Sequence, residues 1–446
     1  MNNNIISYNN KHIWNVSYPI MIGLLAQNVI NVTDTAFLGH VGEVELGASA
    51  MGGIYYVCFF TIFFGFSTGA QIIISRRNGE KNHSAIGPVM IQGTIFLLAL
   101  AVLIVGLSYF FTGDVMRVMI SSEAIWEATM TYVKWRMFSL FFDSFSIMFR
   151  AFYVGITKTK ILTINAIVLA IANVIFDWLL IFGHLGFPRM GIEGAAIASV
   201  IAAFTAFLFI IGYSFLTIDL KKYGFSRIKT FDFGLLRNVL SISVYTMLQY
   251  FISMGTYFLF FVFIERQGHY SLAIANIVRS IYIVMFIPLN ALSATTNTLV
   301  SNLIGEGRIK EVMSLIHRIT RFSFFIMAAS VLLLCLFSKN ILSLYTNDLH
   351  LVTGSVPSIY VIAVALIAGS IGGTYFNGIS GTGNTKSALL LELGVLIIYT
   401  IHIYLTGIVY KLPVHVCLTA EIIYFGGLLV GSALYLRFAD WQKKKI

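Results

Sequence analysis

The amino-acid sequence predicts an all-α membrane protein in which twelve transmembrane helices form two similar bundles of six. Three observations lead to this prediction: an apolar composition, a succession of long apolar stretches, and a repeat that relates the two halves of the chain. Of the 446 residues, 58% are hydrophobic and only 11% are charged, whereas about 25% of the residues of a soluble domain are charged. This composition excludes a soluble globular protein.

Each predicted helix is an apolar stretch long enough to cross a bilayer, which takes about 20 residues. Twelve such stretches follow one another, at residues 13–38, 46–75, 85–111, 129–155, 161–183, 191–218, 236–264, 270–302, 312–337, 352–380, 386–410 and 413–437. The first is too long for the core of a signal peptide and lacks a basic leader, so we expect it to remain as a span.

The basic residues divide unevenly between the two sides of this topology. Twenty of the 29 Lys and Arg fall on the side of the termini and seven on the other, while Arg150 and Arg279 fall inside spans. Because short basic loops stay in the cytoplasm, we expect both termini to be cytoplasmic and the protein to lie in the plasma (inner) membrane. The net charge of +10 then reflects topology and contact with membrane lipids, which argues against a nucleic-acid partner.

A constant shift in residue number, here called the repeat offset, relates the second half of the chain to the first. SRRNGE at 75–80 returns as SNLIGE at 301–306. By the same shift, GITKTK at 155–160 returns as GTGNTK at 381–386. Separate motifs that share one offset without a gap indicate an internal duplication.

The duplication predicts six-helix lobes at residues 1–218 and 236–446, joined by a polar cytoplasmic linker at 219–235. Because six is even, the two lobes are parallel repeats related by an axis along the membrane normal. Two bundles that flank a cleft suit an alternating-access transporter. The alternative is a duplicated membrane scaffold without a transport role.

Polar residues in the first predicted span lie on one helix face. Gln27, Asn31 and Asp34 are spaced i, i+4, i+7, so their side chains share a face that we expect to point into the protein and to line a substrate cavity. Ionisable groups inside spans are costly, which makes Asp34 a functional candidate by default.

A second polar face lies in the fifth predicted span, where Asn173 and Asp177 are spaced i, i+4, and Ser199 adds a hydroxyl from the sixth. Two carboxylates with amide and hydroxyl oxygens form a cluster suited to a proton or to Na⁺, with Asp34 and Asp177 as the Na⁺ ligands. The alternative is that both acids are structural caps near the ends of spans. The repeat offset carries Asp34 onto Phe260 and Asp177 onto Ile403, so the acidic cluster is predicted in the first half only.

The fourth predicted span carries Arg136, Asp143 and Arg150 at intervals of seven residues, which places them on one face of a continuous helix. Two interpretations remain open. Asp143 is neutralised by an arginine, or Arg150 reaches into the cavity and pairs with one of the two aspartates of the acidic cluster.

The second half holds isolated charges at Arg279, Glu392 and Glu421, for which pairing between helices is the simpler interpretation. The sequence contains no phosphate-binding loop and neither of the patterns HExxH and GxSxG. We therefore expect no ATP site and no enzymatic activity, and we expect an ion gradient to supply the energy.

Several segments of the chain match a known family in order and spacing. They are Pro19, NVTDTAFLGHVG at 31–42, GFSTGAQIIISRRNGE at 65–80, the turn at 155–160 followed by ANVIFD at 172–177, MGIEGAAIAS at 190–199, LVSNLIGEG at 299–307 and GISGTGNTK at 378–386. Over nearly its whole length the chain resembles the multidrug and toxic compound extrusion (MATE) transporters, and within them the DinF-like branch.

The resemblance implies a twelve-helix fold of two six-helix lobes that exports small organic compounds, often cationic, in exchange for H⁺ or Na⁺. It implies that Asp34 is the family's first-helix carboxylate and that Pro19 is the helix-bending proline. Asn173 and Asp177 match the fifth-helix asparagine and aspartate of the DinF-like branch, and Ser199 replaces a sixth-helix threonine. The implied partners are a small-molecule substrate and lipids, and the implied protein is a monomer with no cofactor beyond the coupling ion.

One position departs from the family pattern. Where the family leads us to expect a fourth-helix asparagine near the cavity, this chain has Arg150. A fixed positive charge there would disfavour Na⁺ and weaken proton coupling. Export of an anionic substrate or of a lipid-linked saccharide is therefore the alternative to export of cations.

Overall fold

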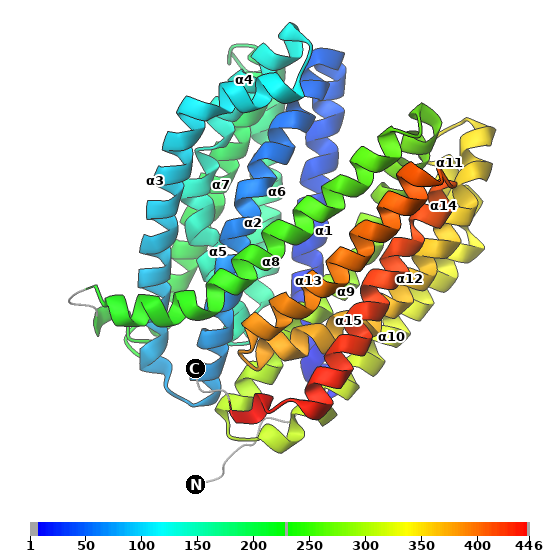
Figure 1. The fold of residues 1–446 in the computed structure, drawn as a ribbon. Helices are drawn as coiled ribbons and strands as arrows, with labels where there is room; N and C mark the ends of the chain where they lie inside the picture. The colour runs from blue at the N-terminus through cyan, green and yellow to red at the C-terminus, as the bar shows by residue number, and fades with distance from the viewer. Residues whose placement is uncertain (1–7, 228–230, 444–446) are drawn as a thin grey trace. The chain divides into compact units, whose positions relative to one another are not determined.

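All regular secondary structure in the described part of the chain is helical. A computed structural model describes residues 8–227 and 231–443, and no β-strand occurs within them (Figure 1). The helices of the first half are α1 Asn10–Val41, α2 Glu43–Gly79, α3 Ile86–Met119, α4 Glu123–Arg136, α5 Ser139–Gly155, α6 Lys160–Phe182 and α7 Gly191–Thr217. Those of the second half are α8 Phe233–Glu265, α9 His269–Gly305, α10 Val312–Leu336, α11 Ser338–Ser343, α12 Leu349–Gly381, α13 Thr385–Tyr404, α14 Val414–Cys417 and α15 Thr419–Phe438, with a π-helical turn at Leu405–Val409 after α13.

The number of spans confirms the predicted multi-pass membrane fold. Eleven helices of the described residues are long and apolar enough to cross a bilayer, and α4 and α5 together make a twelfth if the bent pair is one span. The expectation of one continuous helix at 129–155 was wrong, because α4 and α5 meet at 49°. At the break the N–H groups of Phe138, Leu140 and Phe141 bond to carbonyls only three residues earlier, so the regular α-helical ladder stops there.

The helix bounds confirm the duplication. Helices α2 and α9 have 37 residues each, and the repeat offset carries both ends of α2 onto those of α9. The same offset relates the short 3₁₀ turns His83–Ala85 and Ile309–Glu311. It also carries the start of α4 and the end of α5 onto the two ends of α12, so the second copy of this span is unbroken where the first is bent.

The contacts divide the chain into two compact units. Unit 1 contains residues 8–21, 79–81 and 248–443, and unit 2 contains residues 22–78, 82–227 and 231–247. The division runs through α1 after Met21 and through α8 after Met247, so each of these helices contributes to both units. The predicted lobes at 1–218 and 236–446 are defined by the repeat and not by contacts, and they stay a prediction.

Unit 1 is built around α12, which packs against α9, α10 and α15 (Figure 1). A large apolar cluster joins Ile13 of α1 to residues of α9, α10, α12 and α15 such as Leu299, Ile316, Ile379 and Phe425. Because Ile13 is buried in this cluster, the start of α1 is part of the core of unit 1.

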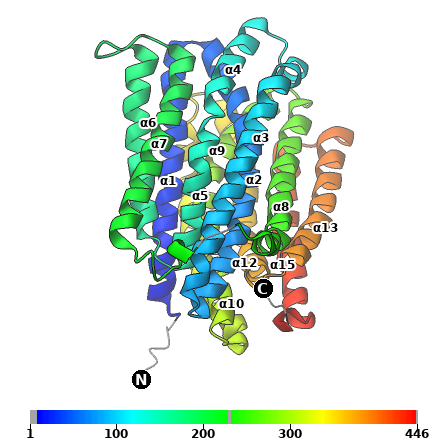
Figure 2. The same ribbon diagram turned by 90° about the vertical axis from the view of Figure 1, so that its left-hand side faces the viewer.

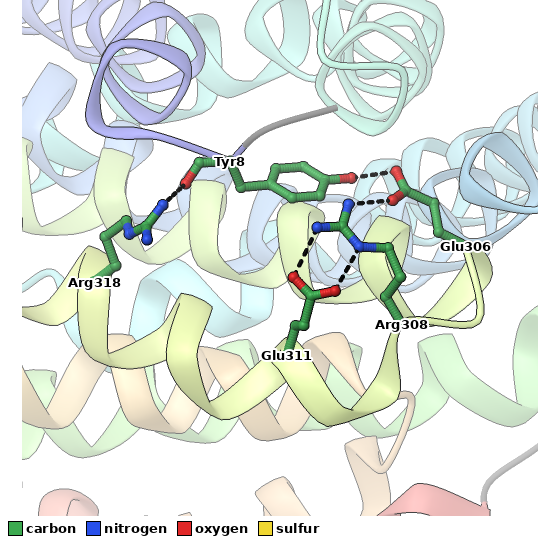
Figure 3. A network of polar contacts seen from close by, with 5 residues as sticks. All are labelled: Tyr8, Glu306, Arg308, Glu311 and Arg318. Atoms are coloured by element: carbon green, nitrogen blue, oxygen red, sulfur yellow. Dashed lines mark hydrogen bonds and ion pairs between the residues drawn. The ribbon is translucent and has the colours of Figure 1, made fainter. Parts of the chain in front are cut away.

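Tyr8, which precedes α1, is fixed to the turn between α9 and α10 by a polar network (Figure 3). The Tyr8 hydroxyl donates to Glu306 at 2.6 Å, and Arg318 donates to the Tyr8 carbonyl at 2.8 Å. Arg308 bridges Glu306 and Glu311 with bonds of 2.7–2.8 Å. Burial, followed by the hydrogen bond to Glu306, raises the pKa of Tyr8 above its ordinary range, so its phenol stays a neutral donor.

In unit 2 the helices α6 and α7 form a close pair (Figure 2). Gly183 ends α6 with φ +77°, and the N–H of Met190 returns to the Leu180 carbonyl at 2.9 Å. A Cβ atom on Gly194 of α7 would lie 2.6 Å from the Leu180 carbonyl oxygen, so only glycine fits there without displacement. This contact holds α7 against α6 one helical turn from Asp177.

Candidate functional site

The predicted acidic cluster lies within unit 2. Asp34 is on α1, Asn173 and Asp177 are on α6, and Ser199 is on α7. Asp177 is fully buried, and Asn173 and Ser199 are 2% and 8% exposed. Asp34 is partly buried. The cluster is therefore enclosed by the protein and is not a surface feature.

Asp34 and Asp177 form a carboxyl pair. Each of the two carboxyl groups acts on the other, so their side chains lie close together. Among the described residues, no N–H or O–H group donates to either oxygen of Asp177 or to Oδ1 of Asp34. Ionised carboxylates can only accept hydrogen bonds, so a hydrogen bond between the two would require a proton on one of them.

Asn173 adds an unsatisfied oxygen on the same helix as Asp177. The Oδ1 atom of Asn173 is buried and has no hydrogen-bond donor within the described part of the chain. Asn173 is one helical turn from Asp177 on α6. Its oxygen is therefore open to a donor or a cation that the protein does not itself supply.

The structure also brings Arg136, at the end of α4, to the carboxyl pair. Its positive charge acts on both Asp34 and Asp177. Its guanidinium lies 3.9 Å from the ring centroid of Tyr56 and donates to Ser139 Oγ at 2.6 Å, across the break between α4 and α5. The predicted single face of Arg136, Asp143 and Arg150 is corrected by that break, since Arg136 belongs to a separate helix.

Tyrosines connect Arg136 to its surroundings. The charge of Arg136 acts on Tyr132, which lies one helical turn earlier on α4, and the Tyr56 hydroxyl donates to Asp143. The charge of Arg136 also acts on Asp143. This agrees with the interpretation that an arginine neutralises Asp143. The sequence marks Arg136 as a charge inside a span, but nothing distinguishes Tyr56 and Tyr132 from the other tyrosines of the chain.

Arg150 has a different neighbour from the one that the sequence suggested. Its guanidinium lies 4.6 Å from the ring centroid of Phe64. The charges that act on Asp34 and Asp177 are those of each other and of Arg136. Of the two arginines, the structure therefore places Arg136 at the carboxyl pair and Arg150 on an aromatic ring.

The remaining candidates lie on α1. Gln27 and Asn31 are exposed, in contrast to the enclosed carboxyl pair. Pro19 lies inside α1, where it removes one backbone N–H from the helical ladder, and it precedes by only a few residues the point where the helix passes from unit 1 to unit 2.

Glu392 and Glu421, the isolated acids of the second half, pair with side chains of other helices, as predicted. Their partners are hydroxyl groups. Glu392 on α13 accepts hydrogen bonds from Ser253 at 2.7 Å and from Tyr424 at 2.6 Å. Glu421 on α15 accepts from Tyr282 and Tyr399, both at 3.1 Å. Within the described residues, neither acid forms an ion pair with Arg279.

Comparisons with known proteins agree with this architecture. A sequence model of the MatE family matches residues 19–179 and again residues 246–405, so the two matches are separated by nearly the repeat offset of the sequence motifs. The chain is 22% identical over 445 residues to the probable multidrug resistance protein NorM of Thermotoga maritima, covering 98% of this chain and 94% of that protein.

Other relatives match over a shorter length. The probable multidrug resistance protein NorM of Agrobacterium fabrum is 26% identical over 206 residues, which are 46% of this chain and 44% of that protein. The chain thus spans less than half the length of this relative. The probable multidrug resistance protein YoeA of Bacillus subtilis is 23% identical over 350 residues, 75% of this chain and 74% of that protein.

Two solved structures share the fold over 97% of both chains. One is an outward-facing multidrug resistance MATE family transporter of the MOP superfamily, with a TM-score of 0.87 and 18% identity. The other is a MOP superfamily transporter from Pyrococcus furiosus, described as having a binding pocket of reverse polarity that suggests a different function, with a TM-score of 0.86 and 18% identity. At this identity the likeness establishes the twelve-helix fold alone.

Proposed function

Because the chain belongs to the MatE family, we propose that it is a multidrug efflux transporter that exchanges small organic compounds, cationic or amphipathic, for H⁺ or Na⁺. The relatives and the structural neighbours are transporters and resistance proteins rather than enzymes. The observation that carries the proposal is the carboxyl pair of Asp34 and Asp177. It gives an apolar protein one enclosed place where a cation can be held.

The carboxyl pair supports exchange because two adjacent carboxylates cannot both stay ionised in a low-dielectric environment. When the shared proton leaves, another positive charge has to take its place. A cationic substrate or Na⁺ can supply that charge, so proton and cation compete for the same two acids. Competition at one site is the physical requirement for exchange in opposite directions.

Arg136 makes the proton the better-supported coupling ion. Its charge acts on both acids and repels any additional metal cation. Na⁺ would also need several oxygen ligands, for which the cluster offers the two carboxyl groups, Asn173 Oδ1 and the Ser199 hydroxyl. No group of three or more His, Cys, Asp or Glu side chains suited to a metal ion occurs in the described ranges.

Protonation can drive alternating access only if the two conformations bind the proton with different affinities. Asp34 lies on the part of α1 that belongs to unit 2, and the same helix continues into unit 1. A change of charge at Asp34 therefore acts on a helix that is part of both units. The proposed role of Pro19 is to let this helix bend.

We also propose that the protein is a monomer in the plasma (inner) membrane, surrounded by lipid, with both termini in the cytoplasm. The excess of basic residues on the side of the termini supports this orientation. No cofactor other than the coupling ion is needed, and the proposal includes no role for ATP.

An anionic substrate or a lipid-linked saccharide is the second candidate cargo. It is favoured by the positive charge of Arg136 at the carboxyl pair and by Arg150 inside the same unit. Asp34→Asn, which removes the negative charge, should leave the rate of anion transport unchanged and should abolish cation transport. The variant therefore separates the two candidate cargoes.

The test uses protein in liposomes with an imposed proton gradient and then a Na⁺ gradient, and it follows efflux of the fluorescent cation ethidium. Asp34→Asn and Asp177→Asn should reduce gradient-driven efflux to the rate of protein-free liposomes. Asp114→Asn is the matched control, since Asp114 is an exposed aspartate of α3 in the same unit, and it should keep full activity. Normal gradient-driven efflux by both test variants would refute the proposed site.

A further inference from the structure

Unit 1 contains a small space between helices that the carboxyl pair does not explain. It lies between α8, α9, α12 and α15, and both Arg279 and Glu421 line it. The part of this space that is open to a water molecule is about 20 Å³, and about 10–15 Å³ is enough to hold one water. The space therefore suits a single water molecule and is too small for an organic compound.

Arg279 of α9 brings a positive charge to this space. It lies ten residues after the start of α9, which is about 15 Å along the helix, and its guanidinium is 5.1 Å from the centroid of the Phe261 ring. The side chain is half-buried, but its Nε atom is buried and bonds to no acceptor in the described part of the chain. A buried N–H group without an acceptor is costly, so this donor needs a partner that the protein does not itself supply.

Glu421 of α15 is the acid that lines the same space. One of its oxygens accepts a hydrogen bond from Tyr282 and the other from Tyr399, both at 3.1 Å. Because each carboxyl oxygen has two lone pairs, each can accept one more bond. In residues 8–227 and 231–443, Glu421 forms no ion pair with Arg279. The two side chains therefore share a space without touching across it.

Tyr257 of α8 adds a hydroxyl group to the lining of this space. The charges of Glu421 and of Arg279 both act on Tyr257, so its phenol lies near the two. A hydroxyl group can donate as well as accept a hydrogen bond. Buried waters have about two to four hydrogen-bonding partners, and these three side chains are enough to supply them.

We propose that one ordered water occupies this space, where it accepts a hydrogen bond from Arg279 Nε and donates one to an oxygen of Glu421. The hydroxyl of Tyr257 is a further partner of this water. The water joins α9 to α15 through two charged side chains that do not pair directly, and it supplies the acceptor that the buried N–H group lacks. The inference concerns unit 1 alone and does not depend on the proposed transport function.

The direct test is a crystal structure of the full chain at a resolution that shows ordered waters. A water peak should lie within about 3.2 Å of Arg279 Nε and of one Glu421 oxygen. Clear density for both side chains with no peak between them would overturn the inference.

A second test fills the space and measures the unfolding temperature of the detergent-solubilised protein. Val278 lines the space and is 1% exposed, and Val278→Ile adds one methylene group, which is comparable in size to a water. In the unchanged protein this variant should lower the unfolding temperature by at least about 2 °C, because it expels the water and leaves the Arg279 N–H without an acceptor. In an Arg279→Met background it should raise the unfolding temperature, because the methylene group then fills a space that no N–H group needs.

Val300→Ile is the matched control for this pair of measurements. Val300 is fully buried on the same helix and does not line the space, so its effect should be equal in both backgrounds. An effect of Val278→Ile in the same direction in both backgrounds would overturn the inference, because a dry space is filled equally well with or without the arginine. Neither test needs an ion gradient, so a failure of the proposed transport would leave this inference standing.

Discussion

The close contact between α6 and α7 gives a prediction about a single methyl group. In Gly194→Ala the added Cβ would lie 2.6 Å from the Leu180 carbonyl oxygen and 2.7 Å from its carbon. Both are backbone atoms of α6, so the clash cannot be relieved by turning a side chain. The two helices have to separate until the contact approaches the ~3.5 Å of ordinary van der Waals distance.

The magnitude follows from two opposing terms. Overpacking of this kind costs about 1–3 kcal/mol, while replacing glycine by alanine inside a helix stabilises it by about 1 kcal/mol. The net expectation is a loss of up to about 2 kcal/mol for Gly194→Ala. Gly212→Ala is the matched control in the same helix, because nothing lies within 4 Å of its added Cβ, and it should gain up to about 1 kcal/mol.

The assay is thermal unfolding of the detergent-solubilised protein, read beside ethidium efflux from liposomes. The expected order of unfolding temperatures is Gly194→Ala, then the unchanged protein, then Gly212→Ala. Efflux should fall in Gly194→Ala alone, since Leu180 lies one turn from Asp177 and the displaced α6 moves the carboxyl pair. A Gly194→Ala protein as stable as Gly212→Ala would show that α6 and α7 are not in close contact.

Two further predictions concern polar networks of unit 1. Tyr8→Phe removes the bond to Glu306 and should cost about 1–2 kcal/mol, seen as faster hydrogen exchange in the first turns of α1. The pKa of Tyr8 is raised in the folded protein, so its contribution to the free energy of unfolding is complete below the unfolded pKa of about 10 and is lost progressively above it. The difference in free energy of unfolding between the unchanged protein and Tyr8→Phe should therefore narrow from pH 8 to pH 11. A difference that stays constant over this range would contradict the prediction. Glu392→Leu leaves the Tyr424 hydroxyl without its acceptor, while Ser253 can still donate to the Gln249 carbonyl at 2.8 Å, and it should lower stability by about 1–3 kcal/mol. Glu392→Gln keeps an acceptor and should unfold near the unchanged protein. Equal losses of stability in both variants would contradict the hydrogen-bonding role.

Much of the fold could be predicted from the sequence because apolar stretches and repeated motifs are local features. The repeat offset was visible in short motifs and reappears in the bounds of α2 and α9. The break between α4 and α5 could not be predicted in this way. The apolar residues of 129–155 continue across it, and its cause is a change of hydrogen-bonding partners over a few residues.

The site was predictable in its parts but not in its contacts. The spacing placed Asp34 and Asp177 on inward faces of their helices, but which charge would lie beside them depends on the packing of α4. Sequence reasoning considered Arg150 for that place, and the structure puts Arg136 there. The bend that separates α4 from α5 sets the direction of Arg136, and no periodicity reports a bend.

The attachment of Tyr8 to Glu306 has a consequence for the order in which the protein is made. The two residues are 298 positions apart, and at 5–20 residues per second the ribosome needs roughly 15–60 s to pass from one to the other. Residues 22–78 and 82–247 can assemble unit 2 during that time. Tyr8 is thus made long before the residue that it binds, and this part of unit 1 is completed only after Glu306 has been made.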